Sequence, residues 1–385
     1  MNVKEKIFEF IDFNLDRFIE ETIKIQQISA PTFQEENRAN YIKNRLELLG
    51  GDKVQIDEVG NVINTYTVDK ELPTIMITAH LDTVFSEEVD LGINREENKI
   101  SGPGLCDNSL GLKGLLVIAE ILDEFELKLD YNLMLTATVG EEGRGNLKGM
   151  QQLMKRYQDG IDAVIVLEGN GLGRITHQAV GSRRWKVEIE AEGGHSWNDF
   201  GNSSAVHTMS RIVSTLADFD LPTDPKTTFN IGKIVGGQAV NAIASEAEML
   251  LEIRSLSKGA LAEISQEFKR IIQDICQQDE VKVKFECIGK RPAGELSKEH
   301  KLVKLLKRIH QKLNLKSKFK PGSTDGNLPL DLNIPAVTIG LTKAENLHST
   351  EEYIETEPLK AGLEQLILVI LEIENYLKNR RQKDE

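Results

Sequence analysis

The stretch Thr74-Ile75-Met76-Ile77-Thr78-Ala79-His80-Leu81-Asp82-Thr83 decides how the chain is interpreted. Apolar and β-branched residues fill positions 74–79, a pattern typical of a buried strand in a mostly parallel sheet. A histidine and an aspartate follow at once. Open sheets of this kind bind ligands just beyond the carboxyl ends of their strands, so His80 stands where chemistry is expected. By itself, the same pair would also fit a chance His-x-Asp in an ordinary loop.

Three further apolar stretches end in the same way. The stretches and the residues that follow them are 133–139 with Glu141 and Glu142, 163–167 with Glu168, and 336–341 with His348. The carboxyl ends of parallel strands meet at one edge of a sheet. One such stretch would be noise, but four that each deliver a histidine or a carboxylate predict a site at that edge.

Asp107 adds a carboxylate from a different kind of segment. It lies in Ser101-Gly102-Pro103-Gly104-Leu105-Cys106-Asp107-Asn108, and a helical pattern follows directly, through Leu122. Two explanations stay open at this point. Asp107 is either the cap of that helix or a further ligand at the sheet edge.

Histidines and carboxylates together form a mixed nitrogen and oxygen ligand set. Such a set suits Zn²⁺, with Co²⁺ or Mn²⁺ as substitutes, and is too rich in nitrogen for a Ca²⁺ site. Two metals about 3.5 Å apart, bridged by a carboxylate, can activate water and polarise a carbonyl. The adjacent pair Glu141 and Glu142 offers a ligand and a general base, because neighbouring side chains point in different directions. Asp82 is placed to orient His80 through its second ring nitrogen.

The order of the expected elements predicts an α/β protein with a second domain inserted into the first. The 385 residues are enough for two domains. Between the third and fourth apolar strands the pattern becomes β-α-β-β-α-β, which is typical of a ferredoxin-like α+β domain. We expect a catalytic domain over 1–180 and 290–385, with a mostly parallel central sheet flanked by helices, and an inserted domain over 181–289. Near the N-terminus, helical spacing covers residues 5–28, and Thr32 to Glu35 reads as the capping box of a second helix.

Composition excludes several classes of protein. A net charge of −14 argues against nucleic-acid binding, which needs a basic surface. No apolar run approaches the roughly 20 residues that a membrane helix needs. The three cysteines make no disulfide framework. With an N-terminus that does not read as a secretory signal, we expect a cytoplasmic protein with no nucleic-acid or membrane partner.

The ordered motifs resemble the M20 family of dinuclear zinc peptidases and amidases. That family includes peptidase T-like aminotripeptidases, glutamate-releasing carboxypeptidases, aminoacylases, acetylornithine deacetylases and succinyl-diaminopimelate desuccinylases. Each motif is weak singly, whereas the complete ordered set is specific. The matching segments are His80-Leu81-Asp82, Gly104-Leu105-Cys106-Asp107-Asn108, Gly140-Glu141-Glu142-Gly143, Leu167-Glu168, Gly193-Gly194-His195-Ser196 and Leu347-His348-Ser349.

The resemblance implies two metal ions, expected to be Zn²⁺, and assigns a ligand role to five residues. Asp107 would bridge both metals. His80 and Glu168 would complete one site, and Glu142 and His348 the other. The inserted domain would be a dimerisation domain, which makes a homodimer the expected state.

The resemblance also implies roles for residues that hold no metal. Glu141 would be the general base, and His195 would reach the partner subunit's active site and stabilise the oxyanion. Asn241 and Arg254 resemble substrate-binding positions, where an arginine can hold a carboxylate bidentately. An ordinary structural ion pair remains an alternative for Arg254. At the position of Glu168 the family tends to have Asp in aminopeptidases and Glu in carboxypeptidases and deacylases.

These observations predict an enzyme that hydrolyses amide bonds. We expect a substrate that is a small peptide or an N-acyl amino acid with a free carboxylate. One alternative is a dedicated deacylase or desuccinylase of a biosynthetic intermediate. Another, from a different class, is an inactive metal-binding scaffold protein. The scaffold would predict a missing ligand or base, and none is missing from the sequence.

Overall fold

The computed structural model describes residues 2–50, 53–374 and 376–377. The chain divides into two compact units, Met1–Ala179 with Glu295–Glu385, and Val180–Gly294. The boundaries expected from the sequence, 180 and 290, compare with 179 and 295 in the structure. The second unit is therefore an insertion within the first.

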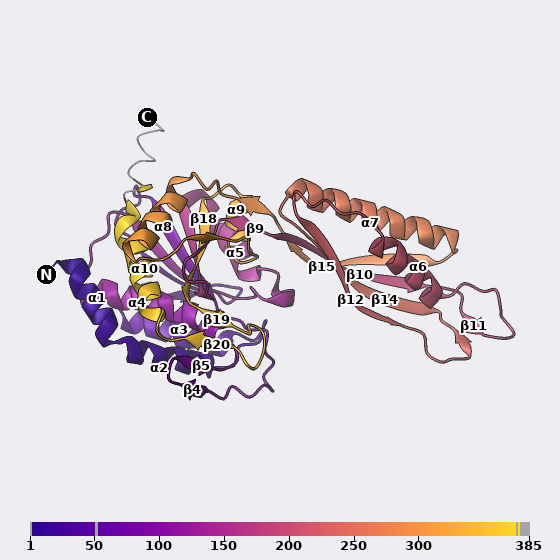
Figure 1. Ribbon diagram of the computed structural model, residues 1–385, viewed down its shortest axis with the longest axis horizontal. Coiled ribbons are helices and arrows are strands. Elements are labelled where there is room, and N and C mark those ends of the chain that lie inside the picture. Colours follow the sequence, from indigo (N-terminus) through magenta and orange to yellow (C-terminus); the bar gives the residue numbers. More distant parts are fainter. Residues whose placement is uncertain (1, 51–52, 375, 378–385) are drawn as a thin grey trace. The chain divides into compact units, whose positions relative to one another are not determined.

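A central sheet organises the first unit (Figure 1). Its strands are β1 Gln55–Ile56, β2 Val62–Tyr66, β3 Thr74–His80, β6 Asn132–Thr138, β7 Ala163–Asn170, β8 Arg174–Thr176, β17 Lys318–Phe319 and β18 Ala336–Thr342. They are ordered β1-β2-β6-β3-β7-β18-β8-β17, and the four middle strands β6, β3, β7 and β18 run parallel. The expected mostly parallel sheet is confirmed, and the carboxyl ends of its middle strands share one edge.

Helices cover both faces of this sheet because its strands are apolar on both sides. The helices of the unit are α1 Val3–Phe13, α2 Leu15–Gln26, α3 Glu36–Leu48, α4 Gly111–Glu124, α5 Lys148–Tyr157, α8 Lys301–Lys312, α9 Asn327–Asp331 and α10 Leu359–Glu372, with short turns η1 Leu105–Leu110, η2 Gly143–Gly145 and η3 Gln158–Gly160. In β3, Ile75 and Ile77 enter the core shared with α4 and α10, whereas Met76 enters the core shared with α5 and α9. This alternation follows from the two-residue period of a strand. Figure 1 shows α10 beside α4 and α8.

A smaller sheet holds two loops of the first unit together. Its strands are β4 Asn94–Glu96, β5 Lys99–Ser101, β19 Ala344–Glu345 and β20 Tyr353–Glu355, in the order β19-β20-β5-β4. The pair formed by β9 Gln178–Ala179 and β16 Gly294–Glu295 lies where the chain passes between the units. Because β20 pairs with β5, the segment that follows His348 lies against the segment that precedes Asp107.

The N-terminal part differs from the expectation in two ways. The helical spacing over 5–28 forms two helices that meet at Asn14, rather than one. The expected capping box is wrong: α3 begins at Glu36 with no side-chain cap. The Thr32 hydroxyl donates to Asp82 Oδ2 at 2.9 Å, and Glu35 Oε1 accepts from Gly140 N–H at 3.0 Å. Both side chains have long-range partners that outcompete the local cap.

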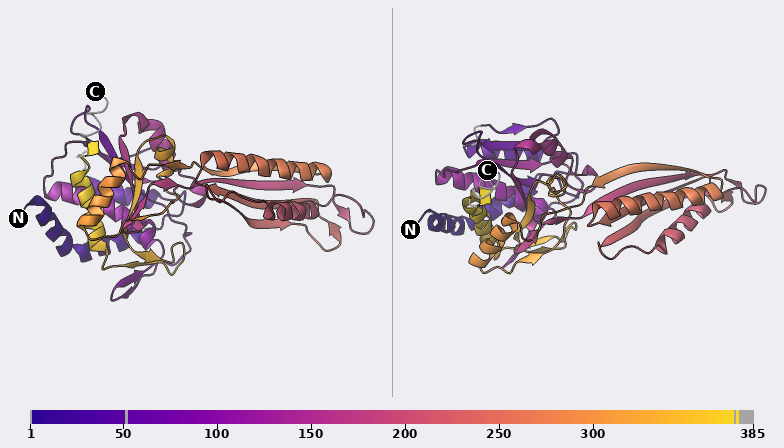
Figure 2. Two further views of the ribbon diagram at one scale, coloured as in Figure 1. Left: turned by 45° about the horizontal axis from the view of Figure 1, so that its top comes forward. Right: turned by 90° about the horizontal axis from the view of Figure 1, so that it is seen from above.

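The second unit is a four-stranded antiparallel sheet with two helices on one face. Its elements are β10 Gly181–Glu190, β11 Gly194–His195, α6 Ala205–Ala217, β12 Thr227–Gly236, β13 Ala242–Ile243, β14 Glu246–Ser255, α7 Lys258–Gln278 and β15 Lys282–Arg291. The main strands are ordered β12-β14-β10-β15, as in a ferredoxin-like fold. Figure 2 shows α6 and α7 on the same side of this sheet. Residues of β14 alternate between buried and partly buried, and helices cover only the buried face.

The α/β fold class with an inserted α+β domain is thereby confirmed. Within the described residues, no helix has the length and apolar character needed to cross a membrane.

Candidate metal centre

The expected site residues of the first unit come together at the carboxyl edge of the sheet. His80 ends β3, Glu168 lies in β7, and Glu141 and Glu142 follow β6. Asp107 lies in η1, and His348 lies in the loop between β19 and β20. His80, Glu141 and Glu142 are buried, whereas the His348 side chain is about half exposed. The group of site residues is thus shielded from solvent on the side of the sheet and exposed to solvent at His348.

Asp107 stands between two histidines. His80 Nε2 lies 2.9 Å from Asp107 Oδ1 and 3.8 Å from Glu168 Oε2. On the other side, His348 Nε2 lies 3.1 Å from Asp107 Oδ2 and 3.1 Å from Glu142 Oε1. Two groups of three ligand atoms result, each with its atoms within 4.8 Å of one another, and Asp107 belongs to both.

The donor atoms fit a pair of metal ions. In the described part of the chain, the buried Oδ1 of Asp107 has no hydrogen-bond donor, because His80 Nε2 is close but not aligned for one. A cation would satisfy this oxygen, and carboxylates crowded around imidazoles are a ligand set that suits a metal ion. A third group of candidate ligands joins His80, Glu141 and Glu142. Glu141 therefore lies close to the same centre without belonging to the two groups that share Asp107.

The alternative explanation of Asp107 as a helix cap does not fit the structure. The N-cap of α4 is Leu110, and the side chain that accepts from Gly111 N–H, at 3.1 Å, is that of the neighbouring Asn108. The Asp107 carboxylate instead faces the two histidines.

Asp82 has a broader structural role than the sequence suggested. The close partner of His80 Nδ1 is the backbone carbonyl of Asp82, at 2.9 Å, whereas the Asp82 carboxylate lies 3.5 Å from that nitrogen. The carboxylate is committed elsewhere, because its two oxygens accept from the backbone N–H groups of Glu141 and Glu142, each at 2.9 Å. A carbonyl only accepts, so Nδ1 of His80 carries a proton and, in the neutral ring, Nε2 has a lone pair facing Asp107.

The turn that carries Glu141 and Glu142 depends on Gly140. Its φ of 64° lies in the left-handed region that favours glycine. This conformation reverses the chain directly after β6 and brings the next two N–H groups onto the Asp82 carboxylate. The backbone of the paired glutamates is therefore held in place by Asp82.

Without metal, the charges of the site shift the pKa values of its groups. Hydrogen bonds to Asp107 and Glu142 raise the pKa of His348 to about 10. Burial disfavours a charged His80, but Asp107 and Asp82 outweigh it and raise the pKa of this imidazole well above its usual range. Burial would raise the pKa of Asp107 as well, but contacts with both histidines hold it below its usual range. For Glu168, burial prevails and raises the pKa. Protons thus occupy the histidines where metal would bind.

Three of the expected residues belong to the second unit and to none of these ligand groups. His195 is exposed and pairs with Ala242 where β11 meets β13. Its Nδ1 accepts from the N–H groups of Trp197 and Asn198, at 3.2 and 3.4 Å, which places the proton of the neutral ring on Nε2. Asn241 lies beside it, since its carbonyl accepts from Ser196 N–H. The two residues thus lie together at the exposed two-stranded sheet of β11 and β13.

Arg254 is engaged within its own unit. Its guanidinium donates to both carboxylate oxygens of Glu252, at 2.7 and 3.0 Å, and Glu252 also accepts from Arg184 at 2.7 Å. This pair corresponds to the structural alternative for Arg254. A substrate carboxylate would have to compete with Glu252 for the same guanidinium.

Sequence reasoning missed two buried carboxylates near the centre. Glu352, four positions after His348, accepts from the N–H groups of Cys106 and Asp107. Glu35 accepts from Gly140 N–H, next to the paired glutamates. For Glu352, the signal in the sequence was an acidic residue close to the motif that contains His348. For Glu35 the available signal pointed to a local cap instead.

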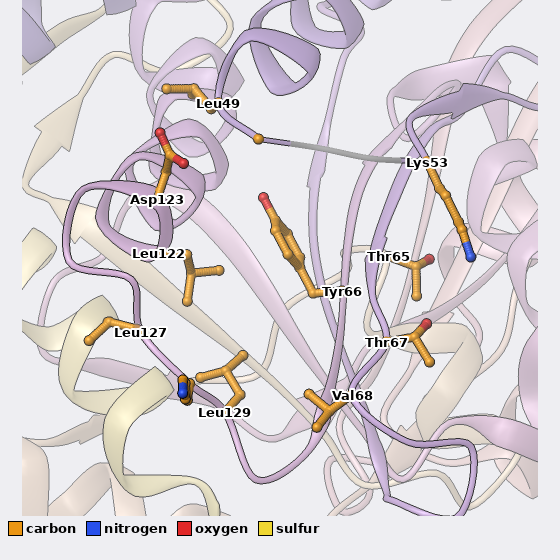
Figure 3. A pocket seen from close by; sticks show the side chains of 12 residues that line it. Leu49, Lys53, Thr65, Tyr66, Thr67, Val68, Leu122, Asp123, Leu127 and Leu129 are labelled. Atoms are coloured by element: carbon orange, nitrogen blue, oxygen red, sulfur yellow. The ribbon is translucent and has the colours of Figure 1, made fainter.

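A pocket at the opposite edge of the sheet is unrelated to this centre. It is lined by residues from the end of β2, the end of α4 and the segment before β6, among them Tyr66, Asp123 and Leu129. Figure 3 shows Tyr66 standing between the side chains of Leu122 and Thr65. None of the metal-centre residues lines it.

Comparison with known proteins shows to which family the chain is similar. The model of peptidase family M20/M25/M40 matches residues 76–372. The uncharacterized protein YqjE of Bacillus subtilis is 24% identical over 374 residues, which cover 93% of this chain and 99% of that protein. An acetylornithine deacetylase of Edwardsiella ictaluri is 24% identical over 341 residues, which cover 82% of this chain and 86% of that protein.

Solved structures share the fold. The aminopeptidase PepT of Bacillus cereus superposes with a TM-score of 0.78 at 22% identity, covering 94% of this chain and 99% of that one. The YXEP protein of Bacillus subtilis, described as a dinuclear metal-binding M20 peptidase, superposes with a TM-score of 0.68 at 16% identity, covering 94% and 99%. On the extent of the match over residues 76–372, the chain belongs to peptidase family M20/M25/M40, whose members hydrolyse amide bonds.

Proposed function

We propose that this protein is a dinuclear zinc hydrolase that cleaves an amide bond in a small peptide or an N-acyl amino acid with a free carboxylate. One observation carries the proposal: Asp107 belongs to two separate ligand groups, His80 with Glu168 and Glu142 with His348. A carboxylate shared in this way is the arrangement that a two-metal site needs. Co²⁺ and Mn²⁺ would fit the same ligand types.

The residues of the chain divide the chemistry between them. Bound metal would supply Lewis acidity and lower the pKa of a water. Glu141, held by its N–H on Asp82 and close to the ligand groups, is the general base that takes the proton of the attacking water and passes it to the leaving amine. His195, whose Nδ1 accepts two backbone N–H groups and whose Nε2 therefore carries the proton of the neutral ring, is suited to donate to the developing oxyanion in the active site of the partner subunit.

Peptide and N-acyl substrates remain competing candidates, and relatives of both kinds are similar to this chain. The Bacillus cereus relative is named an aminopeptidase and the Edwardsiella ictaluri relative an acetylornithine deacetylase. Glu168 favours the deacylase or carboxypeptidase side, given the tendency of the family at that position. Arg254 could hold the substrate carboxylate only after releasing Glu252.

A substrate panel tests the proposal directly. The zinc-loaded protein, with its metal content measured, is assayed on di- and tripeptides and on N-acetyl and N-succinyl amino acids. Turnover of peptides supports a peptidase. Turnover confined to acyl amino acids supports the deacylase. Two bound metals with no turnover of any compound would instead favour a scaffold.

We further propose a homodimer formed through the inserted unit, in the cytoplasm. The edge strand β12 exposes Ile234 and Val235, each by about half, and the loop that follows β11 exposes Trp197 almost entirely. Exposed apolar side chains on a sheet edge are typical of an association surface. The three cysteines are free, which fits a reducing compartment. Sedimentation or light scattering would measure the oligomeric state.

A further inference from the structure

Glu352 is a fully buried carboxylate beside the metal centre to which no role has been assigned. None of its surface is exposed. Its Oε1 accepts two backbone N–H groups, from Cys106 at 2.7 Å and from Asp107 at 3.1 Å. The second of these groups belongs to the residue that both ligand groups share. The Glu352 carboxyl group thus holds the backbone of Asp107, whose side chain contacts the two histidines.

The same residue is fastened to the loop that carries His348. Its N–H donates to the carbonyl of Ser349, and its own carbonyl accepts from Gly102 N–H at 2.8 Å. The next residue, Tyr353, pairs with Ser101 where β20 meets β5. Glu352 is therefore bonded to the segment 102–107 through its backbone carbonyl and its side chain. Its backbone N–H bonds it to the loop that carries His348.

A buried carboxyl group in this place calls for an explanation, because burial of a polar group costs free energy unless it is hydrogen-bonded. Oε1 is satisfied twice, whereas the buried Oε2 has no hydrogen-bond partner among the described residues. A residue that only filled space would be apolar. What the glutamate side chain adds is one oxygen that reaches two successive N–H groups and fixes their orientation.

We propose that Glu352 is a positioning residue that sets the affinity of the centre for metal. By holding the N–H of Asp107, it aims the Asp107 carboxylate between the two histidines, and through its own loop it keeps His348 at bonding distance from that carboxylate. The proposal rests on the proposed metal centre. It adds a residue that touches neither metal nor substrate.

Metal affinity is the measurement that isolates this role. Zinc binding is followed by competition with a chromophoric chelator in the wild type, Glu352→Ala, Glu352→Gln and the control Glu351→Ala. Loss of an outer-shell partner typically weakens binding about 10–100-fold, and we expect that loss for Glu352→Ala. Glu352→Gln keeps an oxygen for the two N–H groups and should restore most of the affinity. Glu351 is exposed, so its variant should bind like the wild type.

A second readout reports geometry rather than affinity. With Co²⁺ in place of zinc, the visible absorption bands depend on ligand geometry, and we expect them to shift in Glu352→Ala and not in Glu351→Ala. A folded Glu352→Ala protein with wild-type affinity and an unchanged spectrum would overturn the proposal. If that variant does not fold, Glu352→Asp decides, because its carboxylate stops one methylene short of the N–H groups: weaker binding supports the proposal and wild-type binding overturns it.

Failure of the metal centre itself would look different. A wild-type protein that binds fewer than two zinc ions, or that binds two and hydrolyses no amide, would contradict the proposed function before any variant is compared. The Glu352 proposal fails only when the wild type is dinuclear and the variants match it.

Discussion

At the scale of a residue, Asp82 connects the turn that carries Glu141 and Glu142 with His80. Its carboxylate holds the N–H groups of Glu141 and Glu142, while its carbonyl orients His80. In Asp82→Asn, an NH₂ group replaces one of the two carboxylate oxygens. This group donates hydrogen bonds, yet it faces a backbone N–H group that is also a donor. We expect a loss of about 1.5–3 kcal/mol in the free energy of unfolding, because a buried bond to a charged group is lost. Chemical denaturation of the metal-free protein measures it.

The same variant should lower kcat more than it lowers zinc affinity, because the carbonyl that orients His80 remains. Thr32→Val is the matched control: it removes only the hydroxyl bond to Asp82 Oδ2 and leaves both N–H groups bound. We expect a smaller effect on both quantities. Equal effects of the two variants would mean that the N–H groups of the glutamate turn do not depend on Asp82.

Glu141 tests the assignment of the general base. Glu141→Gln preserves shape and hydrogen bonding but cannot take a proton. We expect kcat to fall by about 10²–10⁴-fold with both metals retained, since none of the ligand groups that share Asp107 includes Glu141. Turnover and metal content are measured on one preparation. Retained activity would show that another residue is the base.

The raised pKa of His348 predicts how metal binding depends on pH. In the metal-free protein its pKa is raised to about 10, from a usual value near 6.5, by Asp107 and Glu142. Only the neutral ring binds metal, so a proton must leave on binding at neutral pH. Apparent zinc affinity should therefore rise between pH 6 and 8, by about tenfold per pH unit for each proton released. Calorimetry in buffers of different ionisation enthalpy counts those protons, and a pH-independent affinity would contradict the prediction.

At the scale of elements, a buried ionic cluster joins α2 to α4. The ammonium of Lys113 lies 2.7 Å from Glu21 and 2.6 Å from Glu120, and Arg45 of α3 lies 2.5 Å from Glu21. Burial alone would raise the pKa of Glu21, but Lys113 and Arg45 lower it to about 2. These helices cover the sheet face beneath the metal centre. Their packing is therefore coupled to the charge of a single carboxylate.

The stability of this helix layer should decline in acid. The folded pKa of Glu21, about 2, lies below the ordinary value of 4.5, so its stabilisation is complete above pH 4.5 and is lost as the pH falls toward 2. The contribution is on the order of 2–3 kcal/mol. The difference in free energy of unfolding between the wild type and Glu21→Gln should be largest near pH 6 and shrink toward pH 2. A constant difference across that range would contradict the coupling.

At the scale of the whole molecule, catalysis in a dimer predicts complementation. If His195 acts in the partner's active site, His195→Ala and Glu141→Ala homodimers are both impaired, His195→Ala by about 10²–10³-fold in kcat. After subunit exchange, each heterodimer contains one site with a normal base and a normal histidine. Activity should then reappear on mixing. Confirmed heterodimers without activity would place His195 outside the partner's site.

Several parts of the fold and the centre could be predicted from local sequence. The apolar strands that carry or precede His80, Glu142 and Glu168 were recognisable because a strand shows its burial in its own residues. The inserted domain was recognisable because the pattern of expected elements changes to β-α-β-β-α-β between the third and fourth apolar strands. Thr32 and Glu35 show the limit of such patterns. Their residue types and spacing fit a local cap, yet their partners are Asp82 and Gly140, which only folding brings near.

The sequence by itself determined the elements, their order and the set of ligand types. Each of these depends on neighbours along the chain, through strand alternation, helix period and motif spacing. The tertiary structure alone decided that the Asp82 carboxylate holds the glutamate turn and that Glu352 holds Asp107. Those contacts join residues 59 to 245 positions apart, and hydrogen bonds of a few ångströms are set by packing rather than by sequence distance.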